Sequence, residues 1–187
     1  MITSSNTERD RQLLDRLKQG DENALKEIVD LYYTPLCVYS VQFTECEQES
    51  EDIVQDLFIR IWEKRLFDNI TNLRMYLFIS VHNMSVAAAK HHNNYEDIEE
   101  LESMSYQSWE DGFTEDNIAE KRLRLQESLK KLSPKEYDVL IRIIINDRKY
   151  KEVAEEMGVS VNTIKMHLKR AMKKLRNEEM MLLIYFF

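Results

Sequence analysis

Glycine and proline are scarce in this chain, whose 187 residues include only three glycines and two prolines. Tight turns and hairpins depend on these residues, so their scarcity argues against a protein built from many short strands. Apolar residues instead recur at three- and four-residue steps, as at Leu13, Leu14 and Leu17, which is the period of an amphipathic helix. We therefore predict an all-α fold.

Cysteine is nearly absent as well, which limits both disulfide and metal chemistry. Cys37 and Cys46 are the two cysteines, and neither has the CxxC spacing of a zinc or redox motif. A zinc site that combined them with His91 and His92 would match no known ligand spacing, so we predict neither a metal site nor a cofactor. Two isolated thiols are typical of a reducing compartment.

The chain also has no long apolar run. Its first residues, MITSSNTERDRQ, are polar and unlike a signal peptide, so we expect a cytoplasmic protein. The apolar tail MMLLIYFF, residues 180–187, is far shorter than the ~18 residues that a membrane span needs. We expect no membrane insertion. We predict that the tail extends the last helix onto an apolar surface of the N-terminal domain or of a partner, where it mediates a closed autoinhibited state or an inhibitor contact.

Positive charge is in deficit overall, but not everywhere. The formal net charge is −8, and residues 91–120 hold ten acidic side chains and no basic one. Residues 121–187 hold 16 basic and nine acidic side chains, and between Gly158 and Arg176 six basic residues occur without an acidic one. A local basic stripe produces a positive field whatever the total charge, so a nucleic-acid partner is not excluded.

Capping residues divide the N-terminal part of the chain into helices. Gly20 is placed to end the first helix in the left-handed conformation, and Asp21 is placed to cap the second. Pro35 is expected to bend or interrupt that second helix. Apolar periodicity predicts two further helices, at about 50–63 and 75–90.

The middle of the chain, from His91 to about Glu120, has no sustained apolar period. This acidic stretch predicts a linker. Helical pattern resumes beyond it, and Ser133 followed by Pro134 predicts the start of a new helix, with serine as the N-cap and proline at the first position.

The segment YKEVAEEMGVSVNTIKMHLKRAMKKLR, residues 150–176, has the pattern of a helix-turn-helix. Ala154 is small where two helices must cross, Gly158 supplies a positive φ for the turn, and Ser160 can cap the second helix. The predicted core face of this second helix consists of Val161, Ile164, Leu168, Ala171, Met172 and Leu175.

The opposite face of this second helix predicts binding to duplex DNA. A recognition helix presents its first side chains to base edges and its flanking basic residues to phosphates. The base-reading candidates are Ser160, Asn162, Thr163, Lys165 and Met166. The phosphate-binding candidates are His167, Lys169, Arg170, Lys173 and Lys174.

The helix-turn-helix resembles region 4 of bacterial sigma factors and also the DNA-binding domain of LuxR-type response regulators. The segment DIVQDLFIRIW, Asp52–Trp62, separates the two, because it resembles region 2.2 of the extracytoplasmic-function (ECF) group of sigma factors. This resemblance implies two helical domains joined by an acidic linker: region 2 over 1–93, the linker over 94–118, and region 4 with the apolar tail over 119–187. Core RNA polymerase, promoter DNA and an anti-sigma factor are the implied partners.

The two faces of the Asp52–Trp62 helix predict different roles. Its buried stripe is predicted to consist of Ile53, Val54, Leu57, Phe58, Ile61 and Trp62. The resemblance implies that the other face docks on a basic coiled coil of the polymerase clamp through Asp52, Gln55 and Asp56. Without the resemblance, an acidic helix start that favours its own dipole would account for part of this charge.

The resemblance further implies that the −10 element is read by the loop at Phe67–Leu73 and by the helix that follows. Phe67, Asn72, His82 and Asn83 are the implied contacts. His82 stands where the family often has arginine, so we expect weaker and more pH-sensitive phosphate attraction there.

Two other functions compete with a sigma factor. One is a stand-alone helix-turn-helix regulator of the LuxR or response-regulator type, which would bind DNA without polymerase. The other is a metal-dependent nuclease, but Asp52 and Asp56 have no assignable acidic partner from elsewhere in the chain. We therefore predict that the chain is not an enzyme.

Overall fold

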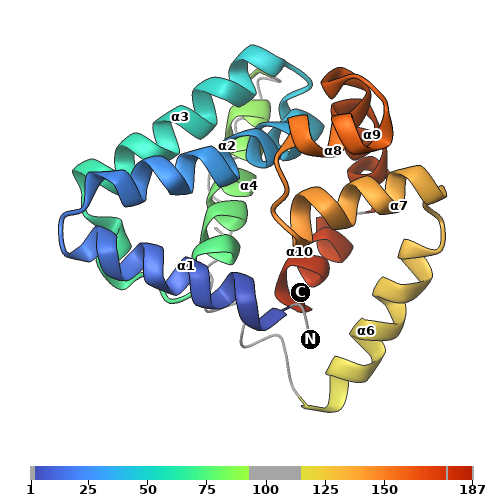
Figure 1. The fold of residues 1–187 in the computed structure, drawn as a ribbon, viewed down its shortest axis with the longest axis horizontal. Helices are drawn as coiled ribbons and strands as arrows, with labels where there is room; N and C mark the ends of the chain where they lie inside the picture. Colours follow the sequence, from blue (N-terminus) through green and yellow to red (C-terminus); the bar gives the residue numbers. More distant parts are fainter. Residues whose placement is uncertain (1–2, 93–114, 176, 187) are drawn as a thin grey trace. The chain divides into compact units, whose positions relative to one another are not determined.

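Helices make up every regular element of the computed structural model, which describes residues 3–92, 115–175 and 177–186. The prediction of an all-α fold is confirmed. The chain divides into two compact units, whose helices are drawn in Figure 1. The described part of Asp10–Gly112 forms the N-terminal unit, and that of Met1–Arg9 and Phe113–Phe187 forms the C-terminal unit. Most of the linker predicted at 94–118 lies outside the described residues.

The N-terminal unit is built on one long central helix. Its described elements are α1 (Thr3–Lys18, from Asp10 onward), α2 (Glu22–Thr44), α3 (Glu47–Glu63), the 3₁₀ turn η1 (Leu66–Asn69) and α4 (Leu73–His92). The long helix α2 packs against both α3 and α4, and α3 also packs against α4. The core of the unit therefore lies where these three helices meet.

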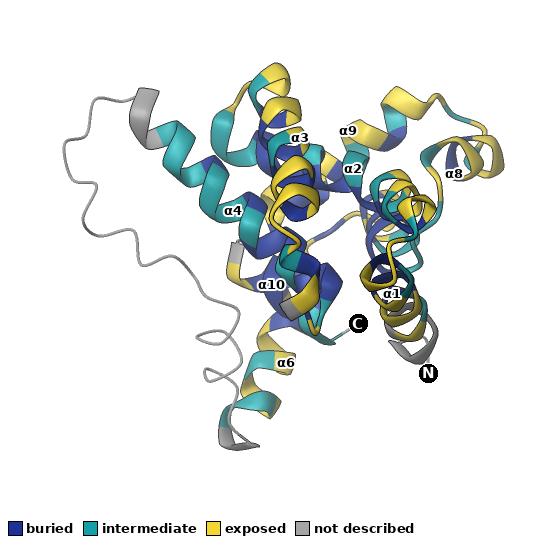
Figure 2. Ribbon diagram, turned by 90° about the vertical axis from the view of Figure 1, so that its left-hand side faces the viewer, coloured by how far each residue is buried: buried dark blue, intermediate teal, exposed yellow. Residues whose placement is uncertain are grey.

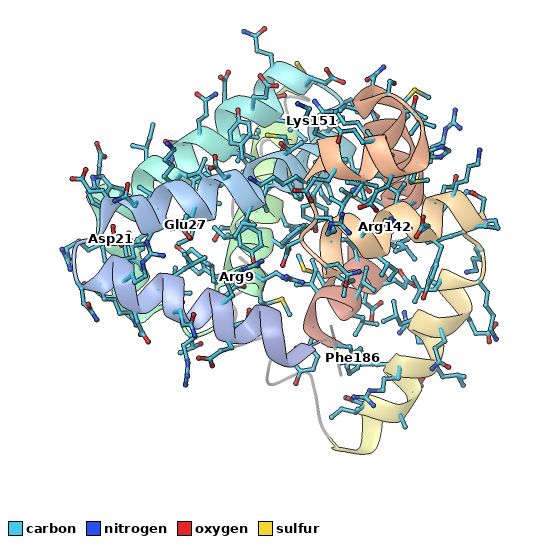
Figure 3. All side chains as sticks on the ribbon, in the orientation of Figure 1. Arg9, Asp21, Glu27, Arg142, Lys151 and Phe186 are labelled. Atoms are coloured by element: carbon cyan, nitrogen blue, oxygen red, sulfur yellow. The ribbon has the colours of Figure 1, made fainter. Side chains whose placement is uncertain are left out.

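The corner between α1 and α2 forms as its residue types predict. Gly20 has a φ of 88°, and the carboxylate of Asp21 accepts a 3.0 Å hydrogen bond from the Asn23 N–H at the start of α2. The Arg16 guanidinium joins α1 to the start of α2, with ion pairs of 2.8 Å to Asp21 and 2.9 Å to Glu27. These two acidic residues are labelled in Figure 3. Both predicted capping roles at this corner are confirmed.

Pro35 does not interrupt α2. The helix runs through it from Glu22 to Thr44, and the proline ring is buried. Proline removes one backbone hydrogen bond from a helix and crowds the preceding turn. Of the predicted bend or interruption, the interruption is therefore wrong, because the helix continues through the buried proline.

The C-terminal unit is built around α9 and the pair formed by α6 and α10. Its described elements are α6 (Glu115–Leu129), α7 (Pro134–Leu140), a π-helical turn (Ile141–Ile145), α8 (Tyr150–Met157), α9 (Val161–Lys174) and α10 (Asn177–Phe186). Helix α9 packs against both α7 and α8, and α10 packs against α6.

The start of α7 agrees with the sequence pattern, whereas the start of α6 differs from it. At the start of α7, Ser133 accepts a hydrogen bond from the Glu136 N–H, and the Glu136 carboxylate accepts one from the Ser133 N–H. This capping box confirms the predicted helix start. By contrast, α6 already begins at Glu115, so the last residues of the range predicted as linker are helical.

The apolar tail forms a separate helix instead of extending α9. Helix α9 ends at Lys174, the extended backbone of Leu175 breaks the run, and α10 begins at Asn177. Met180–Ile184 are all buried, at 0–4% exposure, as the dark blue of α10 in Figure 2 indicates. Arg124 of α6 donates two hydrogen bonds to the Glu178 carboxylate, and the Arg122 guanidinium lies 4.9 Å from the centre of the Phe186 ring. The tail is therefore a buried helix that packs on α6.

Candidate nucleic-acid interface

The helix-turn-helix forms over α8 and α9 as the sequence predicts. Gly158 ends α8 in the left-handed conformation, with a φ of 64°. Ala154 is buried at 4% exposure, where α8 and α9 pack. The Ser160 hydroxyl caps α9 by accepting a 3.1 Å hydrogen bond from the Thr163 N–H. The roles predicted for these three residues are confirmed.

The core face of α9 agrees with the sequence prediction except at its first residue. The five buried side chains, each at 0–2% exposure, are Ile164, Leu168, Ala171, Met172 and Leu175. Val161 is 37% exposed, so its predicted burial is wrong. It occupies the first turn, where the helix projects beyond the neighbours that cover its later turns.

The outer face of the first turns of α9 presents three exposed side chains: Asn162, Lys165 and Met166. Met166 is 46% exposed, although burial of an isolated methionine would be favourable. Ser160 and Thr163 also lie here, but their hydroxyls are 2.9 Å apart and are used in the cap. The side chains that reach furthest into solvent are therefore an amide, an ammonium and a thioether, which suit base edges.

Along the rest of the outer face, the chain exposes cations. Lys169, Arg170 and Lys173 are exposed and form no ion pair with another described residue, while His167 is half-buried. Lys174 differs, because its ammonium lies 2.7 Å from the Glu136 carboxylate of α7. The structure therefore separates three unpaired cations from one that is already paired within the unit.

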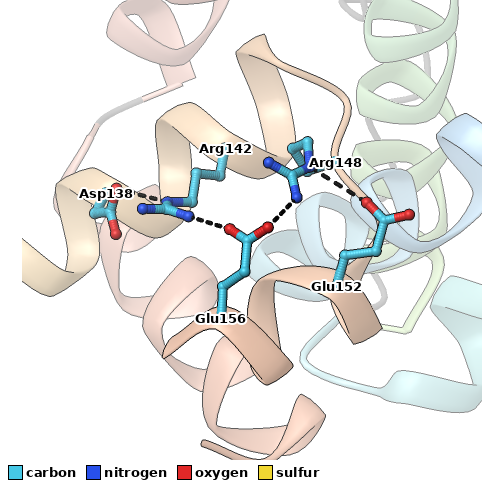
Figure 4. A network of polar contacts seen from close by, with 5 residues as sticks. All are labelled: Asp138, Arg142, Arg148, Glu152 and Glu156. Atoms are coloured by element: carbon cyan, nitrogen blue, oxygen red, sulfur yellow. Dashed lines mark hydrogen bonds and ion pairs between the residues drawn. The ribbon is translucent and has the colours of Figure 1, made fainter. Parts of the chain in front are cut away.

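Two further arginines of this unit are used within a polar network (Figure 4). Arg142 contacts the Asp138 carboxylate at 2.8 Å and the Glu156 carboxylate at 2.6 Å. Arg148 contacts Glu156 and, at 3.2 Å, Glu152. The Arg148 guanidinium lowers the pKa of the Glu156 carboxyl below its ordinary value. This network links α7 and the π-helical turn to α8, so both arginines are already paired with acidic residues of the same unit.

A second candidate surface lies on the exposed face of α3. Asp52 and Gln55 are exposed there and Asp56 is half-buried. Asp56 forms a 2.6 Å ion pair with Arg60, one turn further along α3, and the Gln55 amide donates a 3.1 Å hydrogen bond to the Tyr33 hydroxyl of α2. Asp52 has no ion pair with a described residue, so its charge is fully available to a partner.

Two large apolar side chains accompany these polar groups. Ile59 is 53% exposed, as its place opposite the core stripe predicts. Trp62 is 37% exposed, so its predicted burial is wrong, while the other five residues of the stripe are buried. Trp62 lies in the last turn of α3, where its ring is tilted by 35° to the Phe67 ring of η1, with 6.4 Å between the ring centres.

The four residues associated with −10 recognition do not form one exposed patch. Phe67 is 1% exposed, with the Arg65 guanidinium 5.0 Å from the centre of its ring, so it lies in the core. The Asn72 side chain accepts a 3.0 Å hydrogen bond from the Met75 N–H and thereby caps α4. We therefore remove Phe67 from the set of proposed DNA contacts.

His82 and Asn83 are both half-buried on α4. The His82 ring meets the Phe43 ring edge-on, with 4.9 Å between the ring centres. Burial lowers the pKa of His82 to about 4, because the charged imidazolium would lose its hydration. The ring is consequently neutral throughout the physiological range, and the expected pH sensitivity near neutrality is wrong.

Metal-binding clusters and membrane-spanning helices are both absent from the part of the chain that the structure describes. Within residues 3–92, 115–175 and 177–186, no three His, Cys, Asp or Glu side chains gather as they would around a metal ion. Cys37 and Cys46 are free thiols, and the side chains of His91 and His92 lie outside the described set. No helix in these ranges combines the length and apolarity required to cross a membrane.

An all-α chain with a capped, basic second helix after a glycine turn defines a DNA-binding protein of the helix-turn-helix class. Residues 122–175, which contain this motif, match the family model described as sigma-70, region 4. Over 178 residues the chain is 26% identical to the ECF RNA polymerase sigma factor SigW of Bacillus subtilis (strain 168), covering 90% of this chain and 95% of that relative. The region 4 match and the similarity to SigW along most of the chain both support a sigma factor of the extracytoplasmic-function group.

Proposed function

We propose that this protein binds core RNA polymerase through the exposed face of α3 and places α9 in the major groove of the −35 element. The observation that carries the proposal is the row of exposed cations on α9, which α7 and α8 hold in a fixed orientation and which have no partner among the described residues. Such a row suits a phosphate backbone, with side chains at the helix start directed to base edges.

Docking on polymerase rests on the charge of α3. Asp52, Gln55 and Asp56 present an acidic and polar face beside the exposed Ile59 side chain. A basic partner surface would have to compete with Arg60 for Asp56 but would meet no competitor at Asp52. Exposed ion pairs one turn apart contribute only about 0.3–0.5 kcal/mol, so Arg60 is readily displaced.

The proposed activity is binding without a covalent step. The polymerase performs nucleotide transfer, and this chain selects the promoter and contacts the −10 strand around Asn83 of α4 and Asn72, the residue before α4. An anti-sigma factor that covers one of these surfaces is a proposed partner. A reducing compartment is the proposed location, consistent with the two free thiols.

The test is a pull-down of core RNA polymerase with the full chain, followed by transcription from a randomised promoter library. The wild-type chain is expected to bind core polymerase and to enrich one promoter class. Asp52→Lys combined with Asp56→Lys should abolish the pull-down, whereas Glu22→Lys, an exposed acid at the start of α2, should not. Polymerase binding that survives the double charge reversal would favour the stand-alone regulator.

A further inference from the structure

Glu136 occupies a buried position where the start of α7 meets the end of α9. It lies in the first turn of α7, and its side chain is only 7% exposed. One of its oxygens, Oε2, accepts a 2.8 Å hydrogen bond from the Ser133 N–H and a 2.7 Å hydrogen bond from Lys174 Nζ. Because Lys174 is the last residue of α9, a single carboxylate oxygen joins the start of α7 to the end of the helix proposed to read DNA.

Because the Glu136 carboxylate is buried, its contact with Lys174 is energetically important for the C-terminal unit. A buried carboxylate without a counter-charge is unfavourable, and Lys174 is the cation that supplies it. The Lys174 ammonium, and after it the Ser133 N–H, hold the pKa of Glu136 at about 2, so the carboxylate is charged at any pH near neutrality. A cation in the last turn of a helix is also favoured by the helix dipole.

Lys173, the residue before Lys174, lies in a different environment. Lys173 is exposed and has no ion pair with a described residue. In the sequence the two lysines are equivalent members of one basic run, and only their directions from α9 distinguish them. Lys174 turns back to α7, whereas Lys173 extends into solvent.

We propose that Lys174 is a positioning residue that, together with Glu136, holds the C-terminal end of α9 on α7 and so sets where the base-reading side chains lie. Lys173 is then the phosphate contact at this end of the helix. This inference rests on the proposed function, because it presupposes that α9 enters promoter DNA.

The experiment compares four single variants as full chains bound to core RNA polymerase, on a promoter duplex that the wild-type holoenzyme has selected. Affinity is measured across a series of salt concentrations. Lys173→Met should reduce the slope of log affinity against log salt by about 0.9, the value for one lost phosphate contact. Lys174→Met should leave the slope unchanged and lower affinity about tenfold, the cost of one displaced base contact.

Glu136→Gln is the decisive variant, because the two possible roles of Lys174 predict opposite changes in DNA affinity. The glutamine oxygen can still accept from the Ser133 N–H, but the charge that holds Lys174 is removed. If Lys174 is a positioning residue, affinity falls as in Lys174→Met. If Glu136 only withdraws a phosphate-binding lysine from DNA, Glu136→Gln raises affinity, and Lys174→Met reduces the salt slope; either result overturns the proposal. Unchanged affinity in both variants also overturns it.

Amide hydrogen exchange of the full chain without DNA supplies an independent readout. Exchange at residues 171–175 should become faster in Lys174→Met and Glu136→Gln, while the amides of α4 should be unaffected. Should either variant unfold, Lys174→Gln decides, because its amide has no charge but can still donate to the Glu136 carboxylate: an unchanged salt slope supports the proposal, and a slope reduced by about 0.9 overturns it. A wild-type holoenzyme that selects no promoter sequence would contradict the proposed function, while the exchange result would still test the pairing of the two residues.

Discussion

The Tyr32 hydroxyl donates a 2.6 Å hydrogen bond to the Asp10 carboxylate inside the N-terminal unit, where the two residues are 2% and 6% exposed. The contact ties α1 to α2 across 22 positions of the chain. Removing the Tyr32 hydroxyl would leave the buried Asp10 carboxylate with one hydrogen-bond donor fewer. The carboxylate would still bear the free-energy cost of its desolvation, without the hydrogen bond that offsets part of it.

Tyr32→Phe is therefore expected to lower the free energy of unfolding of the N-terminal unit by about 1–3 kcal/mol. The measurement is urea unfolding followed by the fluorescence of Trp62, in a Trp109→Phe background that removes the second tryptophan. Tyr33→Phe is the matched control: the residue is half-buried and its hydroxyl accepts an exposed hydrogen bond from Gln55, so a change within about 0.5 kcal/mol is expected. Equal effects of the two substitutions would contradict this account.

Helix α10 should stabilise the C-terminal unit through its buried leucines. Leu182 is fully buried, so Leu182→Ala should lower the free energy of unfolding by about 2–5 kcal/mol. Leu123→Ala makes the same chemical change on α6 at a side chain that is 59% exposed, and it should cost no more than about 0.5 kcal/mol. The check is urea unfolding followed by circular dichroism. A neutral Leu182→Ala would mean that the tail does not contribute to the core.

His82 should make the stability of the N-terminal unit fall in acid. Its pKa is about 4 in the folded chain, below the ordinary 6.5, so the unfolded chain binds the proton more readily. The contribution of the neutral ring is complete above pH 6.5 and decreases as the pH falls from 6.5 towards 4. Urea midpoints across this range should decline less steeply in His82→Gln than in the wild type. Parallel declines would show that other groups account for the acid sensitivity.

Lys165 and Lys169 should respond differently to substitution on α9. Lys165 lies among the exposed side chains of the first turns, so Lys165→Ala should cost about 1–3 kcal/mol on the preferred promoter and relax its sequence preference. Lys169→Ala should weaken all sequences alike and reduce the salt slope by about 1. Binding of preferred and scrambled duplexes by the holoenzyme at several salt concentrations distinguishes the two. Uniform losses in both variants would show that Lys165 contacts phosphate as well.

Local patterns predicted the elements of the fold well where one residue type determines the backbone. Gly158 and Gly20 adopt the positive φ that their positions require, and Ser133 caps its helix together with Glu136. These features depend on neighbours within a few residues. Pro35 is the exception, because packing of α2 against α3 and α4 outweighs a local preference for interruption.

Helical periodicity was less reliable at helix ends. The core face of α9 was predicted from Ile164 onward, but Val161 is exposed in the first turn, and Trp62 is exposed in the last turn of α3. At an end, the neighbours that cover one turn do not extend over the next, so a three- or four-residue step no longer implies burial.

By itself, the sequence determined that the chain is helical, that its basic charge is concentrated at α9, and that a glycine turn followed by a serine cap presents this helix. All three follow from residue types and short spacings. Only the tertiary structure decided that the apolar tail is a core helix on α6, that Phe67 is buried, and that Lys174 belongs to Glu136. These three features depend on contacts between residues far apart in the chain. Hydrophobic burial brings such residues together, and because it is non-directional, a sequence pattern does not specify which residues will meet.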